Sequence, residues 1–264
     1  MKQPVIHRIN ETGYEVDIGK QVLRQTNRQA NEISFIRDMQ DRGTHYRLIY
    51  DTLLDIASFR EPDGQRYRLV EVPQMTELHP EGMAARYGGT AEQLKGKSDF
   101  EVIVDQQALG LRRSGVLPQI DIAGEPFTVD LRLHELRHGR DFAPVISLLS
   151  FTITDDGNAF EAYYQPLLKQ TVEIDPGLTE LPDHIIRIRL PNEPGLDPVG
   201  TAWIYGMDER ELLRRHPIQK DLKAELIPLA ETNVPTLIRQ NREKLQQDHQ
   251  ENARKIRPRQ RMHF

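Results

Sequence analysis

An internal duplication constrains the fold of this chain more than any other feature of its sequence. Residues 14–34 align with residues 127–147 without a gap, and seven of the 21 positions are identical. Unrelated stretches of this composition would share roughly one or two identical positions. The identical residues in the first copy are Val16, Asp17, Leu23, Arg24, Ala30, Ile33 and Ser34. The match therefore indicates two related segments that fold in the same way.

A second block repeats in the same order. Residues 73–94 match residues 191–212 at eight positions, which include a shared Pro-x-Gly-x-Ala-x-x-Tyr-Gly motif. Between the blocks, a Tyr-x-x-Leu-Leu pattern occurs in both copies, at residues 50–54 and 164–168. Two copies with so long a period favour paired domains over a solenoid of short repeats.

We therefore predict two tandem homologous halves followed by a tail. The first repeat covers residues 1–118, the second covers residues 119–236, and the tail covers residues 237–264.

The hydrophobic pattern predicts the same elements in both halves. Each opens with apolar residues at every second position, over 14–18 and over 127–133, which is typical of a half-buried strand. Further strand-like stretches follow at 33–36, 46–50 and 67–72, and at 145–152, 160–164 and 185–190. These patterns predict a small, mainly antiparallel sheet in each half.

Two short helices are expected after each sheet. In the shared motif, Asp197 is a good helix N-cap, Pro198 suits the first helical position, and Gly206 suits the end. Thr90 and Asp208 can each cap a second short helix, ending near Lys95 and Arg215. The fold class predicted for each half is therefore α+β.

Residues 134–138 read His-Glu-Leu-Arg-His, which fits the His-Glu-x-x-His pattern of zinc peptidases. That chemistry needs a helix, because only the i, i+4 spacing of a helix brings both imidazoles to one ion. Here the segment continues a strand pattern, along which His134 and His138 would lie about 13 Å apart. The first copy has Gln21, Val22 and Gln25 at these positions. We therefore predict no metal, no cofactor and no catalytic residue.

Two other matched sets suggest structural roles. Asp17 and Arg24, and likewise Asp130 and Arg137, keep the same spacing in both copies. Such a pair can close a hairpin as an ion pair. Tyr87 and Tyr205 are expected to pack the helices onto the sheets.

Composition excludes several classes of protein. The chain has no cysteine, which excludes disulfides, thiolate nucleophiles and cysteine-ligated metals. Its longest mainly apolar run is ten residues, 144–153, whereas a membrane helix needs about 20. The first residues lack the apolar core of a signal peptide. We expect a cytoplasmic protein without a membrane partner.

The tail differs in charge from the rest of the chain. Residues 237–264 carry eight Lys or Arg against three Asp or Glu, a net charge of +5. Because the whole chain has a net charge of -5, the preceding residues carry about -10. Residues 237–253 have a helix-forming composition, and Pro258 favours an extended end. The residues proposed to contact nucleic acid or an acidic partner are Arg254, Lys255, Arg257, Arg259 and Arg261.

Three functions are considered. The preferred hypothesis is a non-catalytic binding or scaffold protein, whose related halves form two similar sites or one shared groove for an unknown protein partner. The alternative is a nucleic-acid-associated protein anchored by its basic tail. The third is a zinc-dependent hydrolase using His134, Glu135 and His138, which requires a helix over those residues.

Overall fold

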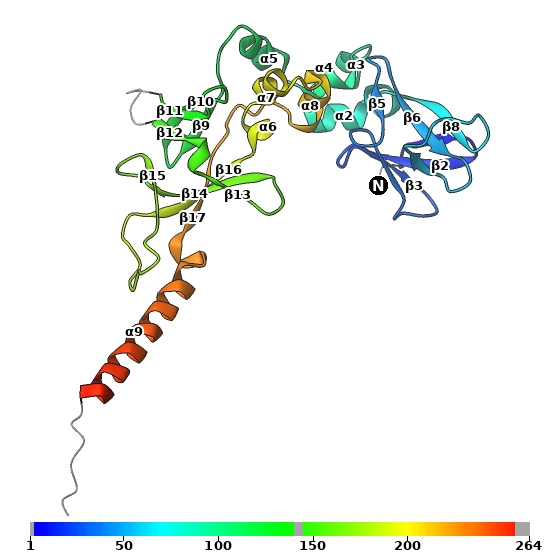
Figure 1. Cartoon of the computed structure of the whole chain (residues 1–264). Coiled ribbons are helices and arrows are strands. Elements are labelled where there is room, and N and C mark those ends of the chain that lie inside the picture. Colours follow the sequence, from blue (N-terminus) through cyan, green and yellow to red (C-terminus); the bar gives the residue numbers. More distant parts are fainter. Residues whose placement is uncertain (1–2, 140–144, 257–264) are drawn as a thin grey trace, which may run out of the picture. The chain divides into compact units, whose positions relative to one another are not determined.

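The computed structural model describes residues 3–139 and 145–256, with side chains as far as Glu251. It confirms a mixed α+β protein with several antiparallel sheets (Figure 1). The chain divides into two compact units. The first unit comprises residues 1–115 and 201–218, and the second comprises residues 116–200 and 219–264.

The first unit opens with a four-stranded antiparallel meander. Its strands are β1 (Ile6–Ile9), β2 (Thr12–Asp17), β3 (Val22–Gln25) and β4 (Glu32–Ser34). A second sheet is centred on β6 (His45–Asp51), which pairs along one edge with β8 (Tyr67–Pro73). On the other edge, β5 (Gln40–Asp41) pairs with the start of β6 and β7 (Ile56–Ser58) pairs with its end. Alternate residues of both sheets, including Tyr14, Leu23, Tyr46 and Tyr50, are buried in one core.

Short helices complete the first unit. They are α1 (Met75–Leu78), α2 (Pro80–Tyr87), α3 (Ala91–Leu94), α4 (Asp99–Ile103), α5 (Gln106–Arg113) and α8 (Glu209–Arg215). The predicted caps at Thr90 and Asp208 are confirmed, since their side chains accept hydrogen bonds from Gln93 N and Glu211 N.

In its described residues, the second unit also has two antiparallel sheets, of four and five strands. Its meander consists of β9 (Gln119–Ile122), β10 (Glu125–Asp130), β11 (Glu135–His138) and β12 (Val145–Ser147). The central strand of its other sheet is β14 (Ala159–Gln165). On one edge of β14 lie β13 (Thr152–Ile153) and β15 (Gln170–Val172); on the other lies β16 (Ile186–Pro191), followed by β17 (Glu225–Pro228).

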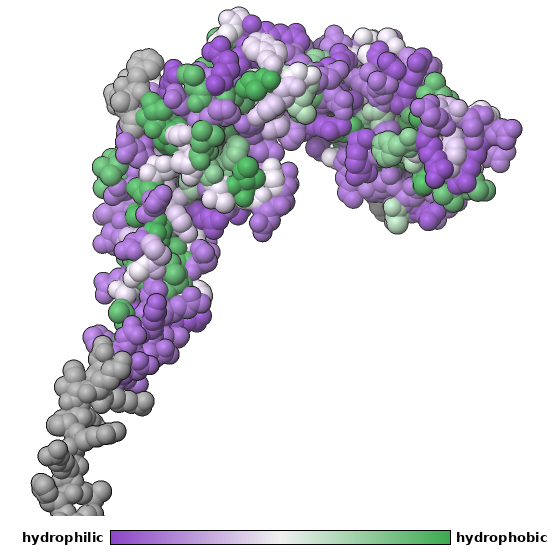
Figure 2. Space-filling model, in the orientation of Figure 1, coloured by the Kyte–Doolittle hydropathy of each residue, from purple (hydrophilic) through white to green (hydrophobic). Residues whose placement is uncertain are grey.

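The remaining helices are short except for the last. They are η1 (Leu148–Ser150), α6 (Glu193–Leu196), α7 (Pro198–Tyr205), η2 (Leu229–Glu231) and α9 (Val234–Ile256). The predicted start of α7 is confirmed, because Asp197 Oδ1 accepts a hydrogen bond from Gly200 N at 2.9 Å. Helix α9 packs through Val234 and Ile238 but is exposed over residues 242–251, where Figure 2 shows mainly hydrophilic side chains.

Two predicted strands need correction. The alternation over residues 127–133 is interrupted because β10 ends at Asp130 and a turn follows, with His134 in the left-handed region at φ 50°. The apolar stretch 145–152 is not one strand but β12, η1 and the start of β13. Ser147 starts η1 by accepting a hydrogen bond from Leu149 N, which ends β12. Helices α1, α4, α5 and α6 were not predicted.

Among the described residues, no helix is both long and apolar enough to cross a membrane.

Candidate functional site

The His-Glu-Leu-Arg-His segment is not helical: His134 lies in a turn and residues 135–138 form β11, a separate strand and not a continuation of β10. Its three candidate ligands have three different partners. His134 Nδ1 lies 3.7 Å from Glu193 Oε1, Glu135 pairs with Arg137, and His138 Nε2 lies 2.8 Å from Glu125 Oε2. The i, i+4 helical geometry needed for a shared zinc ion does not form. No group of three or more His, Asp or Glu within the described ranges could hold a metal ion.

His138 belongs to a polar cluster at the end of β11. Its side chain is fully buried, and Lys169 Nζ lies 3.1 Å from its Nε2 and 3.3 Å from Glu125 Oε2. Hydrogen bonds from His138 and Lys169 lower the pKa of Glu125. In the first unit the positions matching His138 and Lys169 hold Gln25 and Asp55, and both bond to Asn31. The cluster therefore occupies a structural position that the first unit fills with the side-chain amides of Gln25 and Asn31 and the backbone carbonyl of Asp55.

The two predicted Asp–Arg pairs have different outcomes. Arg24 Nη2 donates to Asp17 Oδ2 at 2.8 Å across the β2–β3 hairpin, which confirms the first pair. In the second copy Arg137 donates to Glu135 at 3.0 Å, and the prediction is wrong. Glu135 stands where the first copy has Val22 and offers Arg137 a carboxylate on the same strand face, whereas Asp130 lies 3.7 Å from Arg132.

The matched tyrosines also diverge. Tyr87 packs on the first core, and its hydroxyl accepts a hydrogen bond from Gln21 Nε2 at 3.0 Å, as expected of a packing residue. Tyr205 is 56% exposed and lies in the first unit, so its packing on the second sheet stays a prediction. The residue matching Gln21 is His134, whose side chain contacts Glu193.

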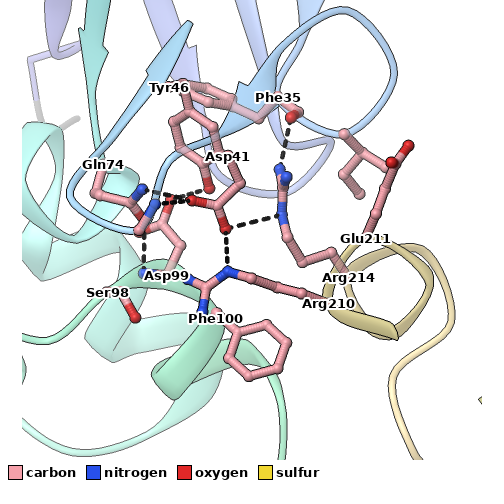
Figure 3. A network of polar contacts seen from close by, with 12 residues as sticks. Phe35, Asp41, Tyr46, Gln74, Ser98, Asp99, Phe100, Arg210, Glu211 and Arg214 are labelled. Carbon is pink, nitrogen blue, oxygen red and sulfur yellow. Dashed lines mark hydrogen bonds and ion pairs between the residues drawn. The ribbon is translucent and has the colours of Figure 1, made fainter. Parts of the chain in front are cut away.

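A buried polar network lies in the first unit around Asp99 (Figure 3). The carboxylate of Asp99 is wholly buried and accepts hydrogen bonds from the Tyr46 hydroxyl at 2.7 Å and from Met75 N and Thr76 N at 2.8 Å each. Gln74 Oε1 accepts from Asp99 N at 2.7 Å. Burial raises the pKa of Asp99, and these hydrogen bonds oppose the shift. Burial also raises the pKa of Tyr46, and the nearby Asp99 charge adds to that shift.

Two arginines of α8 complete the network. In Figure 3, Arg210 and Arg214 both extend from α8 toward Asp41, and Arg210 Nε donates to Asp41 Oδ2 at 3.0 Å. Arg214 is 3% exposed, donates to the Phe35 carbonyl at 2.6 Å and stacks 4.8 Å from the Tyr46 ring centroid. These contacts hold α8 against β5 and β6. A carboxylate and two guanidinium groups engaged in this way have a structural role.

Beside this network lies a groove that we call the first groove, with a cavity of about 470 Å³. It lies along the edge of β6 where β5 and β7 pair. Five arginines contribute to its lining, together with a wall of apolar side chains. The arginines are Arg37, Arg42, Arg47, Arg210 and Arg214.

The second unit has a groove at the matching place along β14, between β13 and β15. This second groove has a cavity of about 800 Å³ and differs in charge. Glu161 stands where the first groove has Arg47, and it is only 7% exposed. Arg187 and Arg189 both donate to its carboxylate. The two grooves thus share a position in the fold but present different chemistry.

Sequence reasoning missed the polar network, although one signal for it was readable. Ser98 and Glu101 form a capping box that begins α4 and places Asp99 at the first helical position. The pairing of Asp99 with Tyr46, 53 residues away, and of Asp41 with Arg210 has no local pattern.

The side chains of the proposed contact residues in the tail lie outside the described part of the chain. Arg254 and Lys255 lie within α9, but their side chains are outside the described part of the chain. Arg257, Arg259 and Arg261 lie wholly outside the described residues.

Comparison with protein-family models, with curated proteins and with solved structures finds no match to this chain.

Proposed function

We propose that this protein is a non-catalytic binding protein built from a duplicated domain, with a protein as its partner. The observation that carries the proposal is the pair of grooves at matching positions along β6 and β14. A duplicated fold that keeps a groove in each copy, while changing its charge, is suited to binding two different surfaces.

Backbone geometry supports the duplication. Non-glycine residues with positive φ recur at the spacing of the sequence repeat: Asn10 with Ala123, Gln21 with His134, and Asp55 with Lys169. Such conformations are uncommon outside glycine, so their recurrence at shifts of 113 and 114 residues favours a common origin. Strand register agrees, since Val16 pairs with Leu23 and Val129 pairs with Leu136.

The state of the side chains supports a non-catalytic role. The polar clusters around Asp99 and His138 engage their carboxylates with neighbouring donors inside the fold. An enzyme site needs such groups directed at a substrate position.

Native mass spectrometry and metal analysis of the purified full chain test whether it holds a metal ion or a cofactor. We expect the mass of the bare polypeptide. One tightly held zinc ion that is lost in His134→Ala would contradict the proposal and favour the hydrolase hypothesis.

Partner capture tests the binding role. The full chain is compared with a double variant, Phe59→Ser in the first groove and Leu149→Ser in the second, whose side chains are 83% and 78% exposed. Leu53→Ser is the matched control, because Leu53 is 70% exposed but lines neither groove. We expect to capture a protein that, once purified, binds wild type and control equally. It should bind the double variant at least tenfold more weakly. Equal binding to all three would contradict a groove-based function.

A second candidate is nucleic-acid association through the tail, favoured by the charge of +5 over residues 237–264. Replacing Arg254, Lys255, Arg257, Arg259 and Arg261 with Gln in the full chain removes these charges without removing α9 residues that pack on the second unit. Binding of labelled DNA and RNA that falls steeply with salt and is lost in this variant would support the candidate. Absence of binding at low salt would eliminate it.

A further inference from the structure

The outer face of the β6 sheet in the first unit exposes apolar side chains. Ile49 pairs in register with Leu69 on β8 and with Ser58 on β7, so these three residues share a face. That face is opposite to the one that buries Tyr46, Leu48 and Tyr50. Leu69 is 53% exposed, and Phe59, which follows β7, is 83% exposed. Ile49, Phe59 and Leu69 also line the first groove.

The second unit partly covers the matching position with its own chain. Tyr163 lies 114 residues after Ile49, at the shift that relates Tyr50 to Tyr164. It packs against a small cluster formed by Leu229 of η2 and by Val234 and Ile238 of α9. Its hydroxyl also donates to Asn233 Oδ1 at 3.3 Å. A short amphipathic segment is therefore a cover that this sheet geometry accepts.

The charged side chains beside the exposed face indicate which kind of segment can bind there. The four carboxylates that line the first groove are engaged within the fold: Asp38 accepts from Ser34 N, Asp41 from Gly43 N and Arg210, Asp208 caps α8, and the exposed Glu211 pairs with Arg215. The Arg42 side chain is exposed and has no hydrogen-bond or ion-pair partner within the described part of the chain. Arg47 is 37% exposed and, among the described residues, pairs with Glu71, which lies opposite it on β8 and is 57% exposed. Arg42, unpaired in the part of the chain that the structure describes, is thus left to face an incoming ligand, and the partly exposed Arg47 remains accessible to one.

We propose that the first groove and the apolar face beside it bind an acidic amphipathic segment of a partner protein. Its apolar side chains pack on Ile49, Phe59 and Leu69, and its carboxylates pair with Arg42 and Arg47, where guanidinium–carboxylate geometry is favourable. The basic α9 of a second copy has the wrong charge for this position. The assignment rests on the proposed binding function and names the partner chemistry of one of its two sites.

Selection from a displayed random peptide library against the full chain tests this assignment. Phe59→Ser and Arg42→Glu remove the apolar and the cationic contact, and both side chains are exposed, so the fold is expected to persist. Leu53→Ser is the control, as an exposed leucine outside the groove. We expect enriched peptides that combine apolar residues with Asp or Glu. They should bind wild type and Leu53→Ser equally, bind either groove variant at least tenfold more weakly, and weaken with added salt.

Three outcomes would overturn the assignment: enriched peptides that are basic, peptides insensitive to both groove variants, or no enrichment. Peptides insensitive to these variants but lost in Leu149→Ser would place binding in the second groove, which removes this inference and leaves the binding function intact. The native mass measurement and the partner capture test that function independently of the peptide selection.

Discussion

Tyr50 and Tyr164 occupy matching buried positions, but their hydroxyl groups have different surroundings. The Tyr50 hydroxyl contacts the Tyr14 hydroxyl at 2.9 Å and donates to Asp55 Oδ1 at 2.8 Å. The Tyr164 hydroxyl is buried and has no hydrogen-bond partner within the described residues. The reason is visible in the sequence, since Phe127 stands where the first copy has Tyr14. Burial, followed by the charge of Glu125, raises the pKa of Tyr164 to about 12.

Removing the two hydroxyls should therefore have unequal effects. We expect Tyr50→Phe to lower the free energy of unfolding by about 1 kcal/mol, because it breaks two hydrogen bonds. Tyr164→Phe should leave stability unchanged or raise it by up to about 1 kcal/mol, because an unsatisfied buried hydroxyl is removed. Urea denaturation of both variants measures the difference. Equal losses would mean that Tyr164 has a partner.

Asp156 provides a pH-dependent contribution at the β13–β14 turn. Its carboxylate accepts hydrogen bonds from Thr154 Oγ1 at 2.6 Å and from Asn158 N at 3.1 Å, and these lower its pKa to about 2. A folded pKa below the unfolded value means that the stabilisation is fully present above about pH 4 and is lost as the pH falls toward 2.

Carbon-detected NMR titration of the carboxyl group should show this shift. We expect a pKa near 2 in the wild type and a rise toward the unfolded value in Thr154→Val, which removes the first hydrogen bond. A normal Asp156 pKa in the wild type would show that the turn does not form these bonds.

At the scale of elements, turns and one docked helix determine how the sheets are joined. The β10–β11 turn places His134 at φ 50°, a conformation that favours glycine or asparagine. Helix α8 attaches to the first unit through Arg210 and the nearly buried Arg214.

The left-handed conformation in this turn predicts unequal effects of two substitutions at His134. His134→Asn should retain the fold and change the free energy of unfolding by less than about 1 kcal/mol, since asparagine tolerates this region. His134→Val should cost more than about 1 kcal/mol, because a β-branched side chain is strained there. Thermal denaturation distinguishes the two, and similar melting temperatures would contradict the left-handed assignment.

Helix α8 predicts unequal roles for adjacent arginines. Arg214→Ala should lower the free energy of unfolding by about 3 kcal/mol, because it leaves the buried Asp41 and the Phe35 carbonyl with fewer partners. Arg215→Ala should change it by less than about 0.5 kcal/mol, since Arg215 is 45% exposed and pairs only with Glu211 on the surface. Chemical denaturation checks both variants. A comparable loss in Arg215→Ala would contradict the proposed attachment.

At the scale of the whole molecule, each unit has its own hydrophobic core. Leu23 is fully buried in the first and Leu136 in the second, and the sequence repeat matches them.

Truncating each leucine should therefore weaken one unit at a time. Leu23→Ala should lower stability by about 2–5 kcal/mol and reduce amide exchange protection in β1 to β4, while β9 to β12 keep theirs. Leu136→Ala should give the reverse pattern. Hydrogen exchange with mass spectrometry measures both, and uniform loss of protection in either variant would indicate a single cooperative unit.

The sequence by itself determined the α+β class, the repeated strand patterns and the caps of the short helices, because period-two alternation and capping depend on nearby residues. It also predicted strand and not helix over residues 134–138, and the Asp17–Arg24 pair, whose contact spans one hairpin. Only the tertiary structure decided that Arg137 pairs with Glu135 and not with Asp130. The same holds for the hydrogen bonds of Tyr46 with Asp99 and of Arg210 with Asp41. Some of these contacts join residues that are distant in sequence. Others depend on which of several neighbouring side chains on one sheet face forms the pair. Neither kind of contact produces a local sequence pattern.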